Sequence, residues 1–150
     1  MPYRRVVVGT DGSQTAAMAV QNAAQMAAAF NAELLIVTAF QPQPTVERVD
    51  EEVPEDIAWR ITDSAVAEDH AVEAAQIALK QGLTSKQIHA LSERGDPATA
   101  LVRVAEERGG DVIVVGSRGM SSPSRFLLGS VPNKVSHHAP CDVMIVHTVD

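Results

Sequence analysis

The sequence is poor in cysteine and in aromatic residues. Its 150 residues include one cysteine, one tryptophan, one tyrosine and three phenylalanines. A single cysteine cannot form a disulfide within the chain, which fits a reducing compartment. The core must therefore come from aliphatic side chains, and a chain of this length can bury enough of them for one domain, which we place at residues 1–150.

Basic residues and long apolar runs are also scarce. Twelve lysines and arginines stand against 19 aspartates and glutamates, giving a formal net charge of −7. An acidic chain without a basic stripe predicts no nucleic-acid partner. No apolar run approaches the roughly 18 residues of a membrane helix, and the valines after Arg5 are too few for a signal peptide. We therefore expect a cytoplasmic protein with no membrane partner.

Short runs of valine, isoleucine and leucine recur as RRVVVG, ELLIVTAF, DVIVVG and DVMIVHTV. Segments with helical spacing separate them. Continuous apolar strands that alternate with helices predict an α/β protein, with a parallel sheet covered by helices on both faces. The run KQIHALSE is mixed in polarity, as expected of an edge strand. The stretch QPQPTVERVDEEVPED, rich in proline and acids, is expected to be a loop.

Three helices have recognisable ends in the sequence. Ser13 can cap the first, which stops at Asn31; the middle helix is expected at about 64–81; Asp96 and Pro97 begin the third. Helical spacing predicts the buried faces as Ala16, Val20, Ala23, Ala27 and Phe30; then Ala67, Ala71, Ala75 and Ala78; then Ala98, Leu101, Val102 and Ala105.

Two loops follow strands in the way that a ligand site requires. In open parallel sheets, ligands bind beyond the carboxyl ends of strands whose crossovers leave on opposite faces. The first loop is in VVVGTDGS, where Gly9, Thr10 and Asp11 directly follow the first strand. The Asp11 carboxylate has two possible roles, accepting hydrogen bonds from a ribose or base, or forming the turn.

The second loop has the pattern G-x2-G-x9-G-S, formed by Gly116, Gly119, Gly129 and Ser130. Glycines let the backbone approach a phosphate, and amides at a helix start near Ser130 would point at an anion. Pro132 favours that helix start. Counter-charge could come from Arg118, Arg125 and Lys134. Neither a Walker A loop nor G-x-G-x-x-G is present, which favours a mononucleotide.

With these motifs the chain resembles the universal stress protein family, through VVVGTDGS, AELLIVTAF, VVGSRG, LLGSVPNKV and PCDVMIVHT. The resemblance implies a Rossmann-like open sheet of order 3-2-1-4-5 that binds ATP, with Mg²⁺, or cyclic AMP, in a stress-response role. It implies that Gly9, Thr10 and Asp11 line the adenosine end and that Ala39 stands beside the adenine. The positions implied for ribose and phosphates are Val115, Gly116, Arg118, Gly119, Gly129, Ser130 and Val131.

The resemblance also implies a homodimer through the last strand, here Asp142 to Val149, whose apolar edge would otherwise be exposed. Two positions depart from the family pattern. Arg118 stands where a histidine is common, and Pro132 follows Val131. The choice between ATP and cyclic AMP therefore stays open at this point.

No catalytic residue or metal site is evident. Asp11 is the sole acid of the expected site, and the five histidines lack zinc-site spacing. Slow ATP hydrolysis or autophosphorylation is the alternative to simple binding. A response regulator would need an acidic pair after the first strand and an aspartate after the third, whereas GTDGS has one acid and Asp96 is placed as a cap. We expect a nucleotide-responsive regulatory protein.

Overall fold

Five parallel strands form a single sheet in the computed structural model, which describes residues 3–40, 63–117 and 130–148. Their order is β3-β2-β1-β4-β5, which confirms the expected fold, and β3 lies at an edge as its mixed polarity indicated. The strands are β1 (Arg5–Gly9), β2 (Glu33–Phe40), β3 (Ile88–Arg94), β4 (Val112–Gly116) and β5 (Asp142–Val146).

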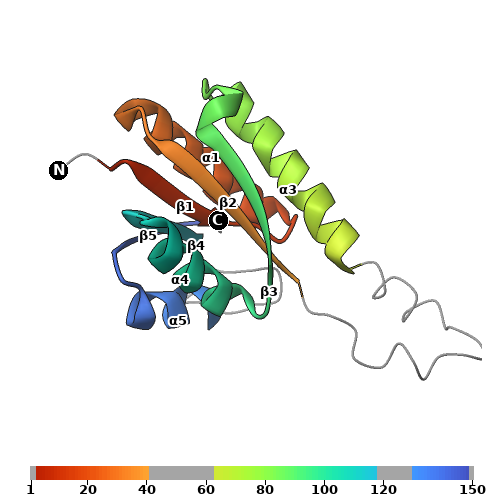
Figure 1. Ribbon diagram of the computed structural model, residues 1–150, viewed down its shortest axis with the longest axis vertical. Coiled ribbons are helices and arrows are strands. Elements are labelled where there is room, and N and C mark those ends of the chain that lie inside the picture. Colours follow the sequence, from red (N-terminus) through yellow and green to blue (C-terminus); the bar gives the residue numbers. More distant parts are fainter. Residues whose placement is uncertain (1–2, 41–62, 118–129, 149–150) are drawn as a thin grey trace, which may run out of the picture.

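Helices cover both faces of this sheet (Figure 1). One face carries α1 (Gln14–Phe30) and α3 (Asp63–Lys80), and the other carries α4 (Pro97–Arg108) and α5 (Ser130–His138). A 3-10 turn, Ser85–Gln87, leads into β3. In the described ranges, no helix is both long and apolar enough to cross a membrane.

The centre of the sheet shows why its strands read as continuous apolar runs. Val6 and Val8 pack toward α1 and α3, whereas Val7 packs toward α4, and all three are fully buried. Successive side chains of a strand point to opposite faces, so a strand with helices on both sides needs apolar residues at every position. Each such valine contributes about 1.5–3 kcal/mol through burial.

The helix ends follow the expected caps. Ser13 Oγ accepts a hydrogen bond from the Ala16 amide at 3.1 Å, and Asp96 Oδ2 accepts one from the Thr99 amide at 3.1 Å. Asn31 ends α1 in the left-handed region with φ 55°, a conformation that asparagine tolerates better than most residues.

Four predicted core positions were wrong, and the first of them, Ala16 near the start of α1, is half-buried. Phe30, the last residue of α1, is 42% exposed and packs edge-on against Tyr3. Val102 is half-buried, whereas Val104 is fully buried. In α3, Ala74 is buried in place of Ala75, which is only half-buried, because an alanine-rich helix offers little contrast between its faces.

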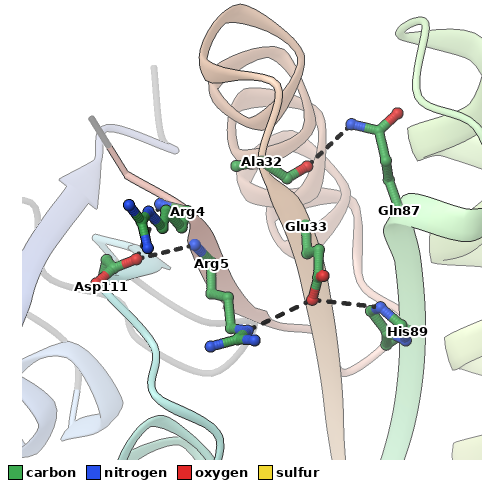
Figure 2. A network of polar contacts seen from close by, with 7 residues as sticks. All are labelled: Arg4, Arg5, Ala32, Glu33, Gln87, His89 and Asp111. Carbon is green, nitrogen blue, oxygen red and sulfur yellow. Dashed lines mark hydrogen bonds and ion pairs between the residues drawn. The ribbon is translucent and has the colours of Figure 1, made fainter.

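The amino ends of the strands are tied together by polar contacts (Figure 2). Asp111 Oδ2 accepts hydrogen bonds from the amides of Arg4 and Arg5, at 2.8 and 3.0 Å. Glu33 Oε1 lies 3.4 Å from Arg5 Nε and 3.5 Å from His89 Nε2. Arg5 and Glu33 are about half exposed, so their ion pair contributes at most about 1 kcal/mol. These contacts hold the amino ends of the strands together. The carboxyl ends of the strands, on the opposite side, are the place expected for a ligand.

Candidate functional site

The carboxyl ends of β1 and β4 lie side by side at the centre of the sheet. Val8 is paired with Val114, so the residues that follow them, Gly9 and Val115, lie next to each other at the carboxyl ends of these strands. From β1 the chain enters α1 on one face, and the helix after β4, α5, lies on the other. This is the topological switch point, where open α/β sheets bind ligands.

The loop after β1 is held by its own side chains. The Thr10 amide donates to the Val37 carbonyl at 3.0 Å, the Gly12 amide to Thr10 Oγ1 at 3.1 Å, and the Ser13 amide to Asp11 Oδ1 at 2.9 Å. Two amides at the start of α1 are therefore already used within the loop. A carboxylate can accept about four hydrogen bonds, so Asp11, which is exposed, retains acceptor capacity for a ligand.

The end of β4 packs against the segment after β5. The Ser117 amide donates to the Val146 carbonyl at 2.7 Å, and the Thr148 amide donates to Ser117 Oγ at 3.2 Å. A Cβ atom on Gly116 would lie 2.9 Å from Thr148 Cγ2. Packing alone therefore requires glycine at 116, a reason that differs from the phosphate approach expected from the sequence. A Cβ atom on Gly9 would meet Leu101 Cδ1 at 3.2 Å.

The other expected site residues are placed as follows. Ala39 and Val131 are half-buried against the same apolar cluster, on the face that carries α4 and α5. Ser130 is exposed and is the first residue of α5. Three further positions, Arg118, Gly119 and Gly129, lie outside the described residues, as do Arg125 and the expected loop after β2.

Lys134 is engaged in a contact that the sequence did not indicate. Its Nζ lies 3.3 Å from Asp96 Oδ2, which joins α5 to the start of α4. The Thr99 hydroxyl, the Thr99 amide and then Lys134 lower the pKa of Asp96 to about 2. Because Lys134 is paired with Asp96, its charge is less available to a phosphate than expected.

Two polar residues outside the expected set lie near the carboxyl ends of β1 and β2. Thr38, on β2, is 2% exposed, and its Oγ1 has no hydrogen-bond partner among the described residues. His70, on α3, packs against Gly12 of the loop after β1. Thr38 could have been singled out from the sequence, because it is a polar residue within the apolar run ELLIVTAF. His70 could not, because its contact depends on how α3 packs against a loop that is distant in the sequence.

Neither a metal cluster nor a reactive thiol emerges in the part of the chain that the structure describes. Within it, no three histidine, cysteine, aspartate or glutamate side chains gather to hold a metal ion. Burial raises the pKa of the Cys141 thiol, and nearby acids add to the shift. This keeps Cys141 as a neutral, half-buried thiol beside β5.

Fold and site together define an open, doubly wound α/β protein with its candidate site at the switch point of the sheet. A family model described as the universal stress protein family matches residues 2–147. Universal stress protein MT1672 of Mycobacterium tuberculosis (strain CDC 1551 / Oshkosh) is 40% identical over 146 residues, which cover 97% of each chain. The chain belongs to the universal stress protein family.

Solved structures show the same architecture. A universal stress protein described as in complex with cAMP is 38% identical, with a TM-score of 0.75 over 99% of this chain and 100% of that chain. The universal stress protein UspA from Lactobacillus plantarum has a TM-score of 0.79 at 23% identity, covering 97% of this chain and 99% of that one. The second likeness supports the fold alone.

Proposed function

We propose that this protein binds an adenine nucleotide at the carboxyl ends of β1 and β4 and acts as a stress-response regulatory protein. The observation that carries the proposal is the likeness, over the whole chain, to a universal stress protein in complex with cAMP at 38% identity. The position of the switch point gives it a physical basis, because two neighbouring crossovers open a crevice there.

In this proposal the two loops have different roles. Gly9, Thr10 and Asp11 serve the adenosine end, where the Asp11 carboxylate accepts hydrogen bonds from ribose hydroxyls. Ala39, which is half-buried near the end of β2, is assigned to the adenine on the family resemblance. The ribose and phosphates are bound by Val115, Gly116, Arg118, Gly119, Gly129, Ser130 and Val131. The start of α5 favours an anion because the helix dipole is positive there.

Cyclic AMP is the ligand that we propose to test first, ahead of ATP with Mg²⁺. Cyclic AMP carries one phosphate charge, whereas ATP needs more counter-charge. Among the described residues, Lys134 was the expected cation, and it lies 3.3 Å from Asp96. The amides of Gly12 and Ser13 also have partners inside their loop. We therefore test the ligand with a single phosphate charge first.

Substitutions of Asp11 test the site more sharply than substitutions of Gly116. Any side chain at Gly116 meets Thr148, so loss of binding there would not separate the ligand from the fold. Asp11→Asn keeps an oxygen for the Ser13 amide but removes the charge, and Asp11→Ala removes both. A hydrogen bond from a ribose hydroxyl to a carboxylate predicts a loss of affinity of about 10- to 100-fold in Asp11→Ala.

The matched control is Glu107→Gln, an exposed substitution in the last turn of α4. Affinities for cyclic AMP and ATP are measured by calorimetry, and folding is checked by circular dichroism. We expect Asp11→Asn to lie between the wild type and Asp11→Ala, with Glu107→Gln unchanged. Equal affinity in all four folded proteins would remove Asp11 from the site.

We also propose a homodimer through β5. This strand is at the edge of the sheet, and its Met144 and Ile145 side chains are 40% and 38% exposed. An edge strand leaves backbone groups free to pair with another chain, and apolar side chains on it favour burial. Ile145→Lys should halve the mass measured by light scattering. Val72→Lys, on an exposed position of α3, is the control, and an unchanged mass in Ile145→Lys would contradict the interface.

A further inference from the structure

The imidazole ring of His70 lies directly against the loop that carries Asp11. A Cβ atom built on Gly12 would be 2.5 Å from Cδ2 and Nε2 of this ring and 2.7 Å from Cε1. Gly12 also has φ +82°, a conformation that favours glycine. Space and backbone conformation therefore both require glycine at this position, and α3 reaches the site through one ring.

Hydrogen bonds link Gly12 and its neighbours within the loop. The Gly12 amide donates to Thr10 Oγ1, and the next amide, that of Ser13, donates to Asp11 Oδ1. Ser13 in turn caps α1, through its Oγ and the Ala16 amide. These bonds connect Gly12, which contacts the ring, to the neighbouring residue that binds the Asp11 carboxylate.

The rest of α3 packs on the sheet and on α1 through small side chains. Its fully buried side chains are all alanines, namely Ala67, Ala71, Ala74 and Ala78. Alanine side chains let the helix lie close to its neighbours, and Ile77 of α3 is partly buried against the same core. A groove of about 540 Å³ also runs along the seam between α1 and α3, lined in part by Met18, Gln21 and Ile77. In addition to these contacts, His70 gives α3 a contact with the loop after β1.

We propose that His70 is a positioning residue that couples α3 to the nucleotide site. The inference rests on the proposed function, and it adds a regulatory element to the same site. When a nucleotide binds the Asp11 loop, the loop holds the ring, and the ring holds α3. By thermodynamic reciprocity, a partner that holds α3 in this position strengthens nucleotide binding by the same factor.

Hydrogen-deuterium exchange with and without saturating cyclic AMP, or ATP with Mg²⁺, tests this coupling. Four proteins are compared: wild type, His70→Phe, His70→Ala and the surface control Val72→Ala. His70→Phe keeps a ring against Gly12, whereas His70→Ala leaves that contact empty. Val72 is 55% exposed on the same helix, so its truncation leaves the contact intact. Calorimetry gives the affinity of each protein for the same nucleotide.

In wild type, His70→Phe and Val72→Ala, the nucleotide should slow amide exchange in α3 by about fivefold or more. His70→Ala should lose this protection and bind the nucleotide about fivefold more weakly, with its unfolding temperature within the range of the other variants. Binding without protection of α3 in the wild type, or equal protection in His70→Ala, overturns the coupling and leaves the proposed function standing. If no variant binds a nucleotide, the proposed function itself fails.

Discussion

Replacing Thr38 with valine is expected to make the protein more stable. Thr38 is 2% exposed, and its Oγ1 has no hydrogen-bond partner among the described residues. It follows Leu34 and Ile36 on the side of β2 that packs toward α1 and α3, an apolar environment. A buried hydroxyl without a partner costs about 1–3 kcal/mol. Valine has nearly the same shape, so Thr38→Val removes this cost without opening a cavity.

The expected gain is about 1–3 kcal/mol in the free energy of unfolding. For a chain of this length, each kcal/mol shifts the melting temperature by about 2–4 °C. Urea denaturation followed by circular dichroism measures the change. The slope of the free energy against urea should stay the same, because both proteins expose the same surface on unfolding.

Thr148 supplies the matched control for Thr38. It is 3% exposed, but its Oγ1 lies 3.4 Å from Ser117 Oγ. Thr148→Val should therefore lower stability, by about 0.5–1.5 kcal/mol. If Thr38→Val lowered stability to a similar extent, the Thr38 hydroxyl would have a partner in solution, such as a buried water, and the reasoning would be refuted.

Two further predictions concern Asp96 and Gly116. The pKa of Asp96 is about 2, below its value of about 3.9 in an unfolded chain. The stability that the ionised carboxylate contributes is therefore present above about pH 4 and is lost as the pH falls toward 2. Asp96→Asn keeps the cap, so its stability deficit should shrink over this range, and a deficit independent of pH would contradict the assignment. Gly116→Ala should cost about 1–3 kcal/mol because of the 2.9 Å approach to Thr148 Cγ2. The double variant with Thr148→Ser, which lacks that methyl group, should recover stability, and a purely additive loss would point to another cause.

The strands and helix caps could be read from the sequence because local chemistry determines them. Val6, Val7 and Val8 form a strand that is buried on both faces, and Ser13 accepts a hydrogen bond from an amide three residues away. The strand order was accessible only through the family resemblance, since alternation of strands and helices fits several orders. The position of the switch point followed from that order.

Long-range packing could not be read in the same way. Gly116 was expected to admit a phosphate, and the sequence did not indicate that Thr148 also packs against it. Nothing near His70 in the sequence points to Gly12, because the contact depends on how α3 lies against the loop. In α3, Ala74 and Ala75 look alike, so the choice of the buried alanine depends on the packed helix.

The measurement that most directly tests the account is calorimetric titration of the nucleotide-stripped protein with cyclic AMP and, separately, with ATP and Mg²⁺. The account predicts saturable binding of an adenine nucleotide at one site per chain, with cyclic AMP as the preferred ligand. Binding of ATP but not of cyclic AMP would support the proposed nucleotide site and contradict the preference for cyclic AMP. No binding of either nucleotide to the folded protein would contradict the central claim.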